Sequence, residues 1–439
     1  MKKIAVKRKE QGGYEMKCLI GFAAAFAATA AFGGFWDTMN KVQRTVETVN
    51  AVGDILNKDT SKPATPETPA AATPSAQPAA PVATVPTVSV PSVPSAPAVD
   101  AAQVAMFAGQ RTTAADTAVP EVKYGNVYIK KPATPEQVQE AKKAYLAEKR
   151  SLDSVRLYFE NVDDATVAAA IAAMPAATYV SVKESPLTTL APFVLLRNAT
   201  QLVIYRTPCA DLKPLGACAR LKTLEMKYCD VSDFSGLAPL QQLETLDLYG
   251  SSVSCSFMPL AACRSLRKID FYAVKGPQST YDSLGALTQV KSFHGGLTKM
   301  TSIKWLTSVP QAEELQVFAE KIDDFTPIAL LVNLKYFRGW NMDGGSMATA
   351  LGDLSFLSAC RRLKKLELPG SAYSNTALIG TFTDLEELDL SNAKQPVDVS
   401  FVKSLPKLKR ITLRGTEVVN GSAIPASVKI YSDKKTKGL

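Results

Sequence analysis

The sequence predicts an α/β solenoid, a horseshoe of about twelve repeats with a parallel β-sheet on its concave side and short helical turns on its convex side. The first observation behind this prediction is a recurrent triplet of apolar residues, spaced as in L-x-x-L-x-L. The triplet begins at residues 152, 177, 199, 221, 243, 266, 290, 312, 334, 363, 385 and 408. Six of the eleven intervals are 22 residues long, and such a constant period is typical of stacked repeats that cover one another's apolar edges.

The second observation concerns the other half of each repeat, where a helical turn is expected. Ten residues before each new triplet stands a residue type whose side chain commonly accepts hydrogen bonds from the first N–H groups of a helix. These residues are Thr189, Asp211, Asp233, Ser256, Thr280, Ser302, Asp324, Asp353, Asn375 and Asp398. Mostly apolar residues follow one and four positions later, as at Leu212 and Leu215. Each repeat is therefore predicted to consist of a strand, a turn and a capped helical turn.

Four copies of the triplet consist almost entirely of leucine. They are Leu221, Leu224 and Met226; Leu243, Leu246 and Leu248; Leu363, Leu366 and Leu368; and Leu385, Leu388 and Leu390. On these motifs, residues 152–424 resemble the leucine-rich repeat family, and most closely its 22-residue class, which occurs in bacterial internalin-like extracellular proteins. The resemblance implies a binding scaffold built on a leucine-rich repeat horseshoe.

Residues 1–35 have the composition of a targeting segment. The basic stretches Lys2-Lys3 and Lys7-Arg8-Lys9 precede a run of 19 residues, from Cys18 to Trp36, that carries no charge. A basic start, an apolar run and small residues at 28–30 are typical of a secretory signal peptide, and the run is also long enough for an uncleaved anchor. In either case we expect the rest of the chain to lie outside the cytoplasm, secreted, periplasmic or tethered to the cell surface.

Residues 36–58 are predicted to form a short amphipathic helix, because apolar residues recur every three or four positions from Trp36 to Leu56. Such a helix either contacts a membrane or a partner helix, or has no specific partner. Residues 59–120 form a stretch rich in proline and alanine, with ten of the 27 prolines between positions 63 and 97. This composition cannot build a core and predicts a disordered, extended spacer.

Residues 121–151 are expected to cap the first repeat and to contain a helix. Thr134, Pro135 and Gln137 form a helix start with a capping box, and the helix should end near Arg150. At the other end, residues 425–439 are predicted to form a capping strand and a basic, solvated tail. The longest interval, 29 residues from 334 to 363, predicts an extra loop at 341–352.

Most of the seven cysteines follow the repeat frame. Cys218, Cys263 and Cys360 stand where other repeats have leucine or phenylalanine, so they are predicted to be small core residues. Cys209 and Cys229 fall in adjacent coils, where a disulfide and two separate thiols both remain open. The spacings contain no C-x-x-C motif, so no metal site is expected.

The sequence carries no sign of an enzyme, a cofactor or a nucleic-acid site. Motifs for phosphate loops, nucleophile elbows and zinc proteases are absent, and the chain has one histidine. The net charge is +9, and the first thirty residues contribute six Lys or Arg and two Glu, which leaves a surplus of five. This surplus is too small to predict nucleic-acid binding. We therefore expect no cofactor, no metal and no catalysis.

The candidate binding site is the column of residues that directly follow the triplets, because strand side chains alternate and these should face the concave solvent. The column runs Tyr158, Lys183, Tyr205, Lys227, Tyr249, Tyr272, Gly296, Phe318, Trp340, Pro369, Ser391 and Arg414. Six of its first nine members are aromatic. Exposed aromatic clusters mark interfaces, although rings can also simply pack on one another across strands.

Charged residues are predicted beside this column. Glu225, Asp247 and Asp270 share one strand position in three successive repeats, and His294 and Arg338 lie further along. A partner would then present apolar anchors, with basic groups near Asp247 and Asp270. The leading hypothesis is a protein partner, the alternative is a glycan or envelope polymer that stacks on the rings, and a third is a purely structural envelope component. Contact with a membrane is expected only through the N-terminal segment.

Overall fold

The computed structural model describes residues 117–149, 151–208, 211–318, 322–340 and 350–439, except for the side chains of Phe318, Trp340 and Ala350. The predictions for segments 1–35 and 36–58 and for nearly all of 59–120 fall outside these residues. So do Cys209 and most of the loop predicted at 341–352. Within the described part, no helix is long and apolar enough to cross a membrane.

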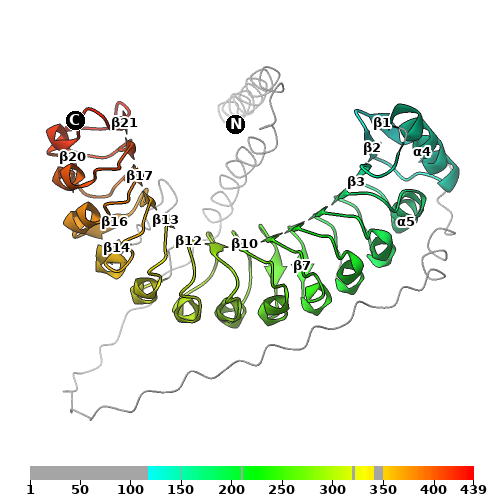
Figure 1. The fold of residues 1–439 in the computed structure, drawn as a ribbon, viewed down its shortest axis with the longest axis horizontal. Coiled ribbons are helices and arrows are strands. Elements are labelled where there is room, and N and C mark those ends of the chain that lie inside the picture. Colours follow the sequence, from blue (N-terminus) through cyan, green and yellow to red (C-terminus); the bar gives the residue numbers. More distant parts are fainter. Residues whose placement is uncertain (1–116, 150, 209–210, 319–321, 341–349) are drawn as a thin grey trace, which may run out of the picture. The chain divides into compact units, whose positions relative to one another are not determined.

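A single 15-stranded sheet lines the inner side of the arc, and every helix of the described residues lies on the outer side (Figure 1). Neighbouring strands are parallel throughout, except for the antiparallel hairpin of the first two. In order across the sheet the strands are β1 (Glu121–Lys123), β2 (Asn126–Ile129), β3 (Arg156–Glu160), β4 (Tyr179–Lys183), β5 (Gln201–Tyr205), β6 (Thr223–Lys227), β8 (Thr245–Asp247), β10 (Lys268–Asp270), β11 (Ser292–His294), β12 (Glu314–Phe318), β13 (Tyr336–Trp340), β15 (Lys365–Glu367), β17 (Glu387–Asp389), β19 (Arg410–Thr412) and β21 (Lys429–Tyr431).

The strand register places the central apolar residue of each triplet in one buried row. Leu224, Leu246 and Ile269 are successive partners across β6, β8 and β10, and all three are fully buried. Because each repeat leaves an apolar edge that only the next repeat covers, this row continues along the whole solenoid. The predicted α/β horseshoe with a parallel concave sheet is thereby confirmed.

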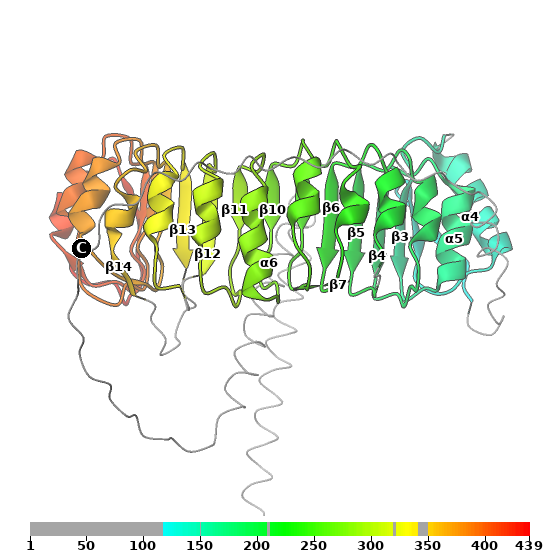
Figure 2. The same ribbon diagram turned by 90° about the horizontal axis from the view of Figure 1, so that it is seen from below.

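Short helices stack side by side along the outer face of the sheet (Figure 2). In the described part of the chain three of them are α-helices, namely α4 (Pro135–Lys149), α5 (Asp164–Ala173) and α6 (Gln278–Asp282). The others are single 3₁₀ turns: η2 (Ala191–Leu195), η3 (Lys213–Ala217), η4 (Ser235–Leu237), η5 (Met258–Ala262), η6 (Ser283–Ala286), η7 (Lys304–Ser308), η8 (Thr326–Leu330), η9 (Leu354–Leu357), η10 (Thr376–Thr381), η11 (Ser400–Ser404) and η12 (Gly421–Ala423).

Three small parallel pairs lie at the turns between sheet and helices. They are β7 (Asp230–Val231) with β9 (Ser252–Val253), β14 (Ala350–Asp353) with β16 (Ala372–Ser374), and β18 (Val397–Asp398) with β20 (Val418–Val419). Each pair links two successive coils, so it adds backbone hydrogen bonds to the contacts between neighbouring repeats.

Eight of the ten predicted caps accept a hydrogen bond from the backbone N–H two residues later. These are Thr189, Asp211, Asp233, Ser256, Ser302, Asp324, Asp353 and Asp398. The prediction is wrong for Thr280, which lies buried inside α6 because that helix begins two residues earlier. It is also wrong for Asn375, which has a left-handed backbone and donates through its amide to Asp353.

The first repeat lies in a different register from the predicted one. Leu157, not Val155, aligns with Val180 of the next strand, so the triplet begins at Ser154 and not at Leu152. Ser154 is polar, and this hid the true frame from a search for apolar residues. As a result Tyr158 lies opposite Ser181, one row away from the predicted column.

Both ends of the solenoid carry additional ordered structure. Thr134 and Gln137 form the predicted capping box at the start of α4, since each backbone N–H donates to the other side chain, at 2.8 and 3.3 Å. At the C-terminus the backbone of Lys437 pairs with that of Glu417. The N–H of Val418 donates to the carbonyl oxygen of Lys437 at 2.8 Å. The side chains of Lys434, Lys435 and Lys437 are exposed, as predicted for a solvated tail, while the backbone of the tail pairs with the last coil.

The cysteines of the repeat frame are part of the core. Cys218, Cys263 and Cys360 are fully buried, and each thiol donates to a backbone carbonyl of the preceding coil. Burial raises the pKa of all three thiols to about 12. A disulfide between Cys209 and Cys229 stays a prediction, since Cys209 lies outside the described residues.

Candidate binding face

Three rows of side chains leave the sheet on its concave side. The middle row consists of residues that are direct partners from strand to strand: Tyr128, Tyr158, Ser181, Val203, Glu225, Asp247, Asp270, His294, Gln316, Arg338, Glu367, Asp389, Thr412 and Tyr431. Glu225, Asp247 and Asp270, which we call the acidic strip, therefore share one row with the predicted His294 and Arg338. The predicted aromatic column forms the next row, toward the ends of the strands.

Lys227 neutralises much of the acidic strip. Its Nζ lies 2.8 Å from Glu225 Oε2 and 3.1 Å from Asp247 Oδ2, and its side chain is only 13% exposed. Burial disfavours the charged ammonium, but Asp247 and Glu225 outweigh that effect and raise the pKa of Lys227. This lysine of the aromatic column thus serves the strip as an internal counter-ion.

Asp247 and Asp270 also organise the chain that follows them. Each accepts a hydrogen bond from the N–H two residues later, at 2.9 Å from Tyr249 and 3.0 Å from Tyr272. Asp270 is 5% exposed, and its Oδ2 lies 4.0 Å from Nδ1 of His294. Because these carboxylates already have partners within the chain, basic groups of a ligand are not required to neutralise them.

His294 connects the strip to the next strand. Its Nε2 lies 3.3 Å from Glu314 Oε2, which also accepts from the Ser292 hydroxyl at 2.6 Å. The hydrogen bond with His294 is the main reason that the pKa of Glu314 falls to about 2. Arg338 lies two strands further on, where its Nε is 3.4 Å from Glu367 Oε2. His294 and Arg338 therefore belong to separate polar clusters.

Four tyrosine rings form a continuous cluster over β5, β6, β8 and β10. We call Tyr205, Tyr228, Tyr249 and Tyr272 the tyrosine cluster. Successive ring centroids lie 5.5, 5.5 and 5.4 Å apart, with two edge-on contacts followed by a parallel stack of Tyr249 on Tyr272. Tyr249, in the middle, is only 6% exposed. The structure thus brings three predicted site residues together and adds Tyr228, which the sequence analysis did not select.

Two glycines make room for these rings. A Cβ at Gly250 would come within 2.5 Å of the Tyr228 ring, and a Cβ at Gly296 within 2.7 Å of the Tyr272 ring. No side chain larger than hydrogen fits at either position without moving a tyrosine. The ring positions are therefore fixed by the backbone beneath them as well as by their mutual contacts.

The other two predicted aromatic residues stand apart from the cluster. Phe318 and Trp340 are direct partners at the ends of β12 and β13. The strand between them and the cluster, β11, is followed by Gly296, which provides no ring to bridge the gap. Their side chains lie outside the described part of the structure, so their contribution to a site stays a prediction.

A second group of rings lies at the N-terminal end of the concave face, and the sequence analysis named only one of its members, Tyr158. Tyr128 stacks on Tyr158 at 4.8 Å, and Tyr158 lies 5.1 Å from Tyr179. The Arg156 guanidinium lies 4.3 Å from the centroid of the Tyr179 ring. Burial raises the pKa of Tyr179 to about 12. Tyr128 precedes the first repeat, and Tyr179 lies on β4 two residues before Ser181 of the middle row. A search along one repeat position could therefore find neither.

A hollow of about 320 Å³ at the C-terminal end of the concave face was also missed. It lies over short side chains of β17 and β19 and is lined by Lys365, Glu367, Glu387, Leu388, Asp389, Arg410, Thr412, Arg414 and Tyr431. Lys365 pairs with Glu367 at 2.8 Å, and Arg410 pairs with Glu387. Its lining is thus polar and largely paired within itself.

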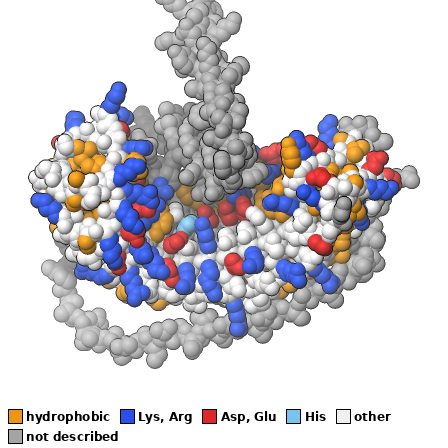
Figure 3. Space-filling view, turned by 45° about the horizontal axis from the view of Figure 1, so that its top comes forward, with side chains coloured by type: hydrophobic (Ala, Val, Ile, Leu, Met, Phe, Trp, Pro, Cys, Tyr) orange, Lys and Arg blue, Asp and Glu red, His pale blue; other side chains and the backbone are white. Residues whose placement is uncertain are grey.

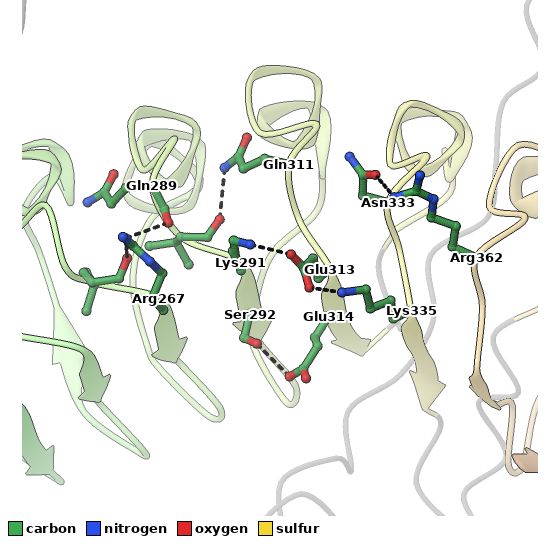
Figure 4. A network of polar contacts seen from close by, with 12 residues as sticks. Arg267, Gln289, Lys291, Ser292, Gln311, Glu313, Glu314, Asn333, Lys335 and Arg362 are labelled. Atoms are coloured by element: carbon green, nitrogen blue, oxygen red, sulfur yellow. Dashed lines mark hydrogen bonds and ion pairs between the residues drawn. The ribbon is translucent and has the colours of Figure 1, made fainter. Parts of the chain in front are cut away.

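Beside the concave face, the segments that lead into the strands form a ladder of opposite charges. Glu313 lies 2.5 Å from both Lys291 and Lys335, one on each neighbouring coil (Figure 4). Acidic and basic side chains also lie intermingled over the face that Figure 3 presents. Such pairing leaves no broad surface of one sign there, and long-range attraction of a highly charged polymer would need one.

Among the residues that the structure describes, no group of three or more His, Cys, Asp or Glu side chains is placed to hold a metal ion. The acidic strip does not form such a group, because Lys227 lies between two of its carboxylates. The face therefore offers aromatic rings, tyrosine hydroxyls and paired charges as its recognition chemistry.

Comparison with known proteins agrees with this architecture. No protein-family model matches the chain, and no curated protein sequence does either. Among solved structures, an internalin of Listeria monocytogenes superposes with a TM-score of 0.51 and 18% identity, over 69% of this chain and 85% of its own. A leucine-rich repeat protein of Leptospira interrogans gives 0.50 and 14%, over 76% and 94%.

Proposed function

Starting from a leucine-rich repeat fold similar to that of internalins, we propose that this chain is a binding scaffold that recognises a protein partner through its concave face. The observation that carries the proposal is the tyrosine cluster, four contiguous rings held in place over four adjacent strands. Tyrosines supply a large, rigid contact area at a low entropic cost. The proposed site comprises Tyr205, Tyr249 and Tyr272 with Lys227, and Phe318 and Trp340 extend it.

Ring geometry favours a protein over a glycan. A sugar binds to an aromatic residue by lying on a free ring face. The rings of Tyr249 and Tyr272 are nearly parallel, at 4°, so each covers one face of the other. Tyr205 and Tyr249 each contact the Tyr228 ring at a steep angle. The ring edges that the cluster presents suit the apolar side chains of a polypeptide better than the flat face of a sugar.

The proposal includes a location outside the cytoplasm, which rests on the basic and apolar composition of residues 1–35. The scaffold would contact a membrane only through that N-terminal segment. It would use no metal, cofactor or nucleic acid, and it would not be an enzyme, because the charged groups of the face are engaged with one another.

The test compares the wild-type full chain with a double variant, Tyr249→Ala with Tyr272→Ala, in binding to secreted proteins and to a panel of polysaccharides. We expect a protein to bind the wild type, and its affinity to fall at least about tenfold in the double variant, because two central rings are removed. The matched control is Leu330→Ala with Val332→Ala, which removes two exposed apolar side chains from the convex side.

Two results would contradict the proposal. Equal binding by the wild type and the tyrosine variant would place the site elsewhere. Binding of a polysaccharide that depends on the tyrosines would favour the alternative function, a glycan or envelope-polymer module.

A further inference from the structure

Most charged groups that line the hollow at the C-terminal end of the concave face already have a partner of opposite charge. The Glu367 carboxylate lies 2.8 Å from the Lys365 ammonium and 3.4 Å from the Arg338 Nε. The Glu387 carboxylate pairs with the Arg410 guanidinium on the next strand. These pairs join the walls of the hollow, and a ligand would have to break them in order to bind the same groups.

Two charged groups of the lining, Asp389 and Arg414, take no part in this pairing. Asp389 accepts hydrogen bonds from the N–H and the hydroxyl of Ser391, at 2.9 and 2.6 Å, and within the described residues no cation forms an ion pair with it. No ion pair or hydrogen bond in the described part of the chain involves the exposed Arg414 guanidinium. Asp433, after the next strand, accepts the Gly415 N–H at 3.0 Å instead.

These two groups stand on neighbouring coils and are offset along the strand direction. Asp389 is the direct partner of Thr412 across β17 and β19, and Arg414 follows Thr412 by two residues. With strands about 4.8 Å apart and a rise of about 3.3 Å per residue, the Cα atoms of Asp389 and Arg414 lie roughly 8 Å apart. The Thr412 side chain between them is short, which leaves the space between the two charges to the hollow.

The lining as a whole is balanced, but its two sides differ in sign. It contains three carboxylates and three cations. The carboxylates all belong to β15 and β17, whereas Arg410 and Arg414 belong to β19 and the turn after it. Tyr431 faces this second side: a hydrogen bond from Lys429 is the main reason that the pKa of Tyr431 is lowered, and Arg410 and Arg414 act in the same direction. A ligand that matches both sides must carry both charges.

We propose that this hollow is a second binding site, separate from the tyrosine cluster, and that it binds a small zwitterion, a free α-amino acid. The ammonium group of the amino acid would contact Asp389, and its carboxylate would contact Arg414, whose guanidinium can donate two parallel hydrogen bonds. A ligand with only one charge would leave one of the two residues without a partner. The hollow of about 320 Å³ has room for such a molecule.

The dimensions of the ligand agree with this assignment. An α-amino acid holds its two charges a few ångströms apart, and a charge-assisted hydrogen bond of about 2.8 Å is added at each end. The whole bridge is therefore comparable in length to the separation of Asp389 and Arg414 along the sheet. The inference does not depend on recognition of a protein by the tyrosine cluster.

The first experiment measures binding of the twenty free amino acids to the full chain by isothermal titration calorimetry. We expect at least one to bind the wild type, and its affinity to fall at least about tenfold in Asp389→Asn and in Arg414→Gln, because each change removes one charge-assisted contact. The asparagine keeps an oxygen that can accept from Ser391. The matched controls are Asp323→Asn and Arg361→Gln, which remove exposed charges outside the hollow and should keep full affinity.

The second experiment assigns the two contacts with modified forms of the amino acid that binds. Its N-acetyl form lacks the ammonium group and its amide lacks the carboxylate, so both should bind the wild type at least about tenfold more weakly. Asp389→Asn should then cost the N-acetyl form little more, and Arg414→Gln should cost the amide little more, because the contact in question is already missing. If each variant weakens both modified forms as much as it weakens the free amino acid, the assigned contacts are wrong.

A polypeptide is the other source of the same chemistry, since neighbouring lysine and aspartate side chains also carry both charges. The peptides acetyl-Lys-Asp-amide and acetyl-Asp-Lys-amide test this source. If either binds more tightly than every free amino acid, and its binding depends on Asp389 and Arg414, the assignment of a small ligand is overturned. If no amino acid binds the wild type at millimolar concentration, or if binding is unchanged in both variants, the hollow is not the proposed site. The test with Tyr249→Ala and Tyr272→Ala is unaffected by either result.

Discussion

Individual charged residues on the concave face act mainly on their neighbours within the chain. Glu314 shows this clearly, because its carboxylate accepts hydrogen bonds from Ser292 and from the ring of His294. Lys227 likewise contacts two carboxylates of the acidic strip at once. The sequence analysis placed Lys227 and His294 in a binding site, whereas the distances show that both first contact carboxylates of the sheet itself.

Glu314 should make folding stability depend on pH. Its pKa is lowered from 4.5 to about 2 in the folded protein, mainly through the hydrogen bond with His294. A lowered carboxyl pKa stabilises the fold above the unfolded value, so this contribution should be complete above about pH 4.5 and disappear as the pH falls toward 2. Urea unfolding across that range should show a weaker pH dependence for Glu314→Gln than for the wild type. Identical pH dependence would contradict this assignment.

The buried thiols should be chemically inert in the native protein. Burial raises the pKa of Cys218, Cys263 and Cys360 to about 12, so almost no thiolate exists near neutral pH. We expect alkylation of these three residues to be slow in the folded chain and fast in denaturant, as followed by mass spectrometry. Rapid labelling under native conditions would show that the core opens. Denaturation without reductant would also reveal a Cys209–Cys229 disulfide, if one forms, as two protected thiols.

At the scale of one repeat, a side chain at the start of the helical turn accepts hydrogen bonds that fix the direction of the chain. Asp233 accepts from the Ser235 N–H at 2.7 Å and from the Ser235 hydroxyl at 2.5 Å. The hydrogen bonds with Ser235 hold the pKa of Asp233 below its usual value. In seven other repeats a side chain at the same position also accepts a hydrogen bond from the N–H two residues later, so η4 represents them.

Removal of this cap should destabilise the chain measurably. Asp233→Ala leaves the first N–H groups of η4 without a partner and should lower the free energy of unfolding by about 1 kcal/mol. Asp233→Asn keeps an acceptor oxygen and should cost less. Denaturant unfolding of both variants checks the order. An alanine variant as stable as the wild type would show that water replaces the cap without loss.

Elements with a strict period were predictable from sequence, and those that depend on contacts between side chains were not. The buried row through Leu224 and Leu246 follows from alternation along strands, so its frame could be read directly. The frame of the first repeat was predicted wrongly because Ser154 stands where the other repeats have an apolar residue. The tyrosine cluster depends on Tyr228 at a strained turn and on the space above Gly250, and no repeat position signals either feature.

At the scale of the whole molecule, the C-terminal hollow and the tyrosine cluster occupy different parts of the same curved face. The hollow forms where short side chains such as Asp389 and Thr412 stand between the larger Glu367 and Tyr431 in the middle row. Its position depends on the relative sizes of side chains from four repeats, which a search for periodic residues does not compare. A solenoid can thus vary its concave surface from repeat to repeat while its buried frame stays constant.

The same architecture predicts how damage to the core should spread. Leu246 on β8 is fully buried between Leu224 and Ile269, its partners on the neighbouring strands. Leu246→Ala should lower the free energy of unfolding by about 2–5 kcal/mol, because a cavity remains where the side chain was. Repeats contact only their neighbours, so hydrogen exchange should quicken most between residues 221 and 290, while the terminal repeats retain their protection. Uniformly faster exchange along the chain would instead show that the solenoid unfolds as one cooperative unit, and unchanged exchange around β8 would contradict the register itself.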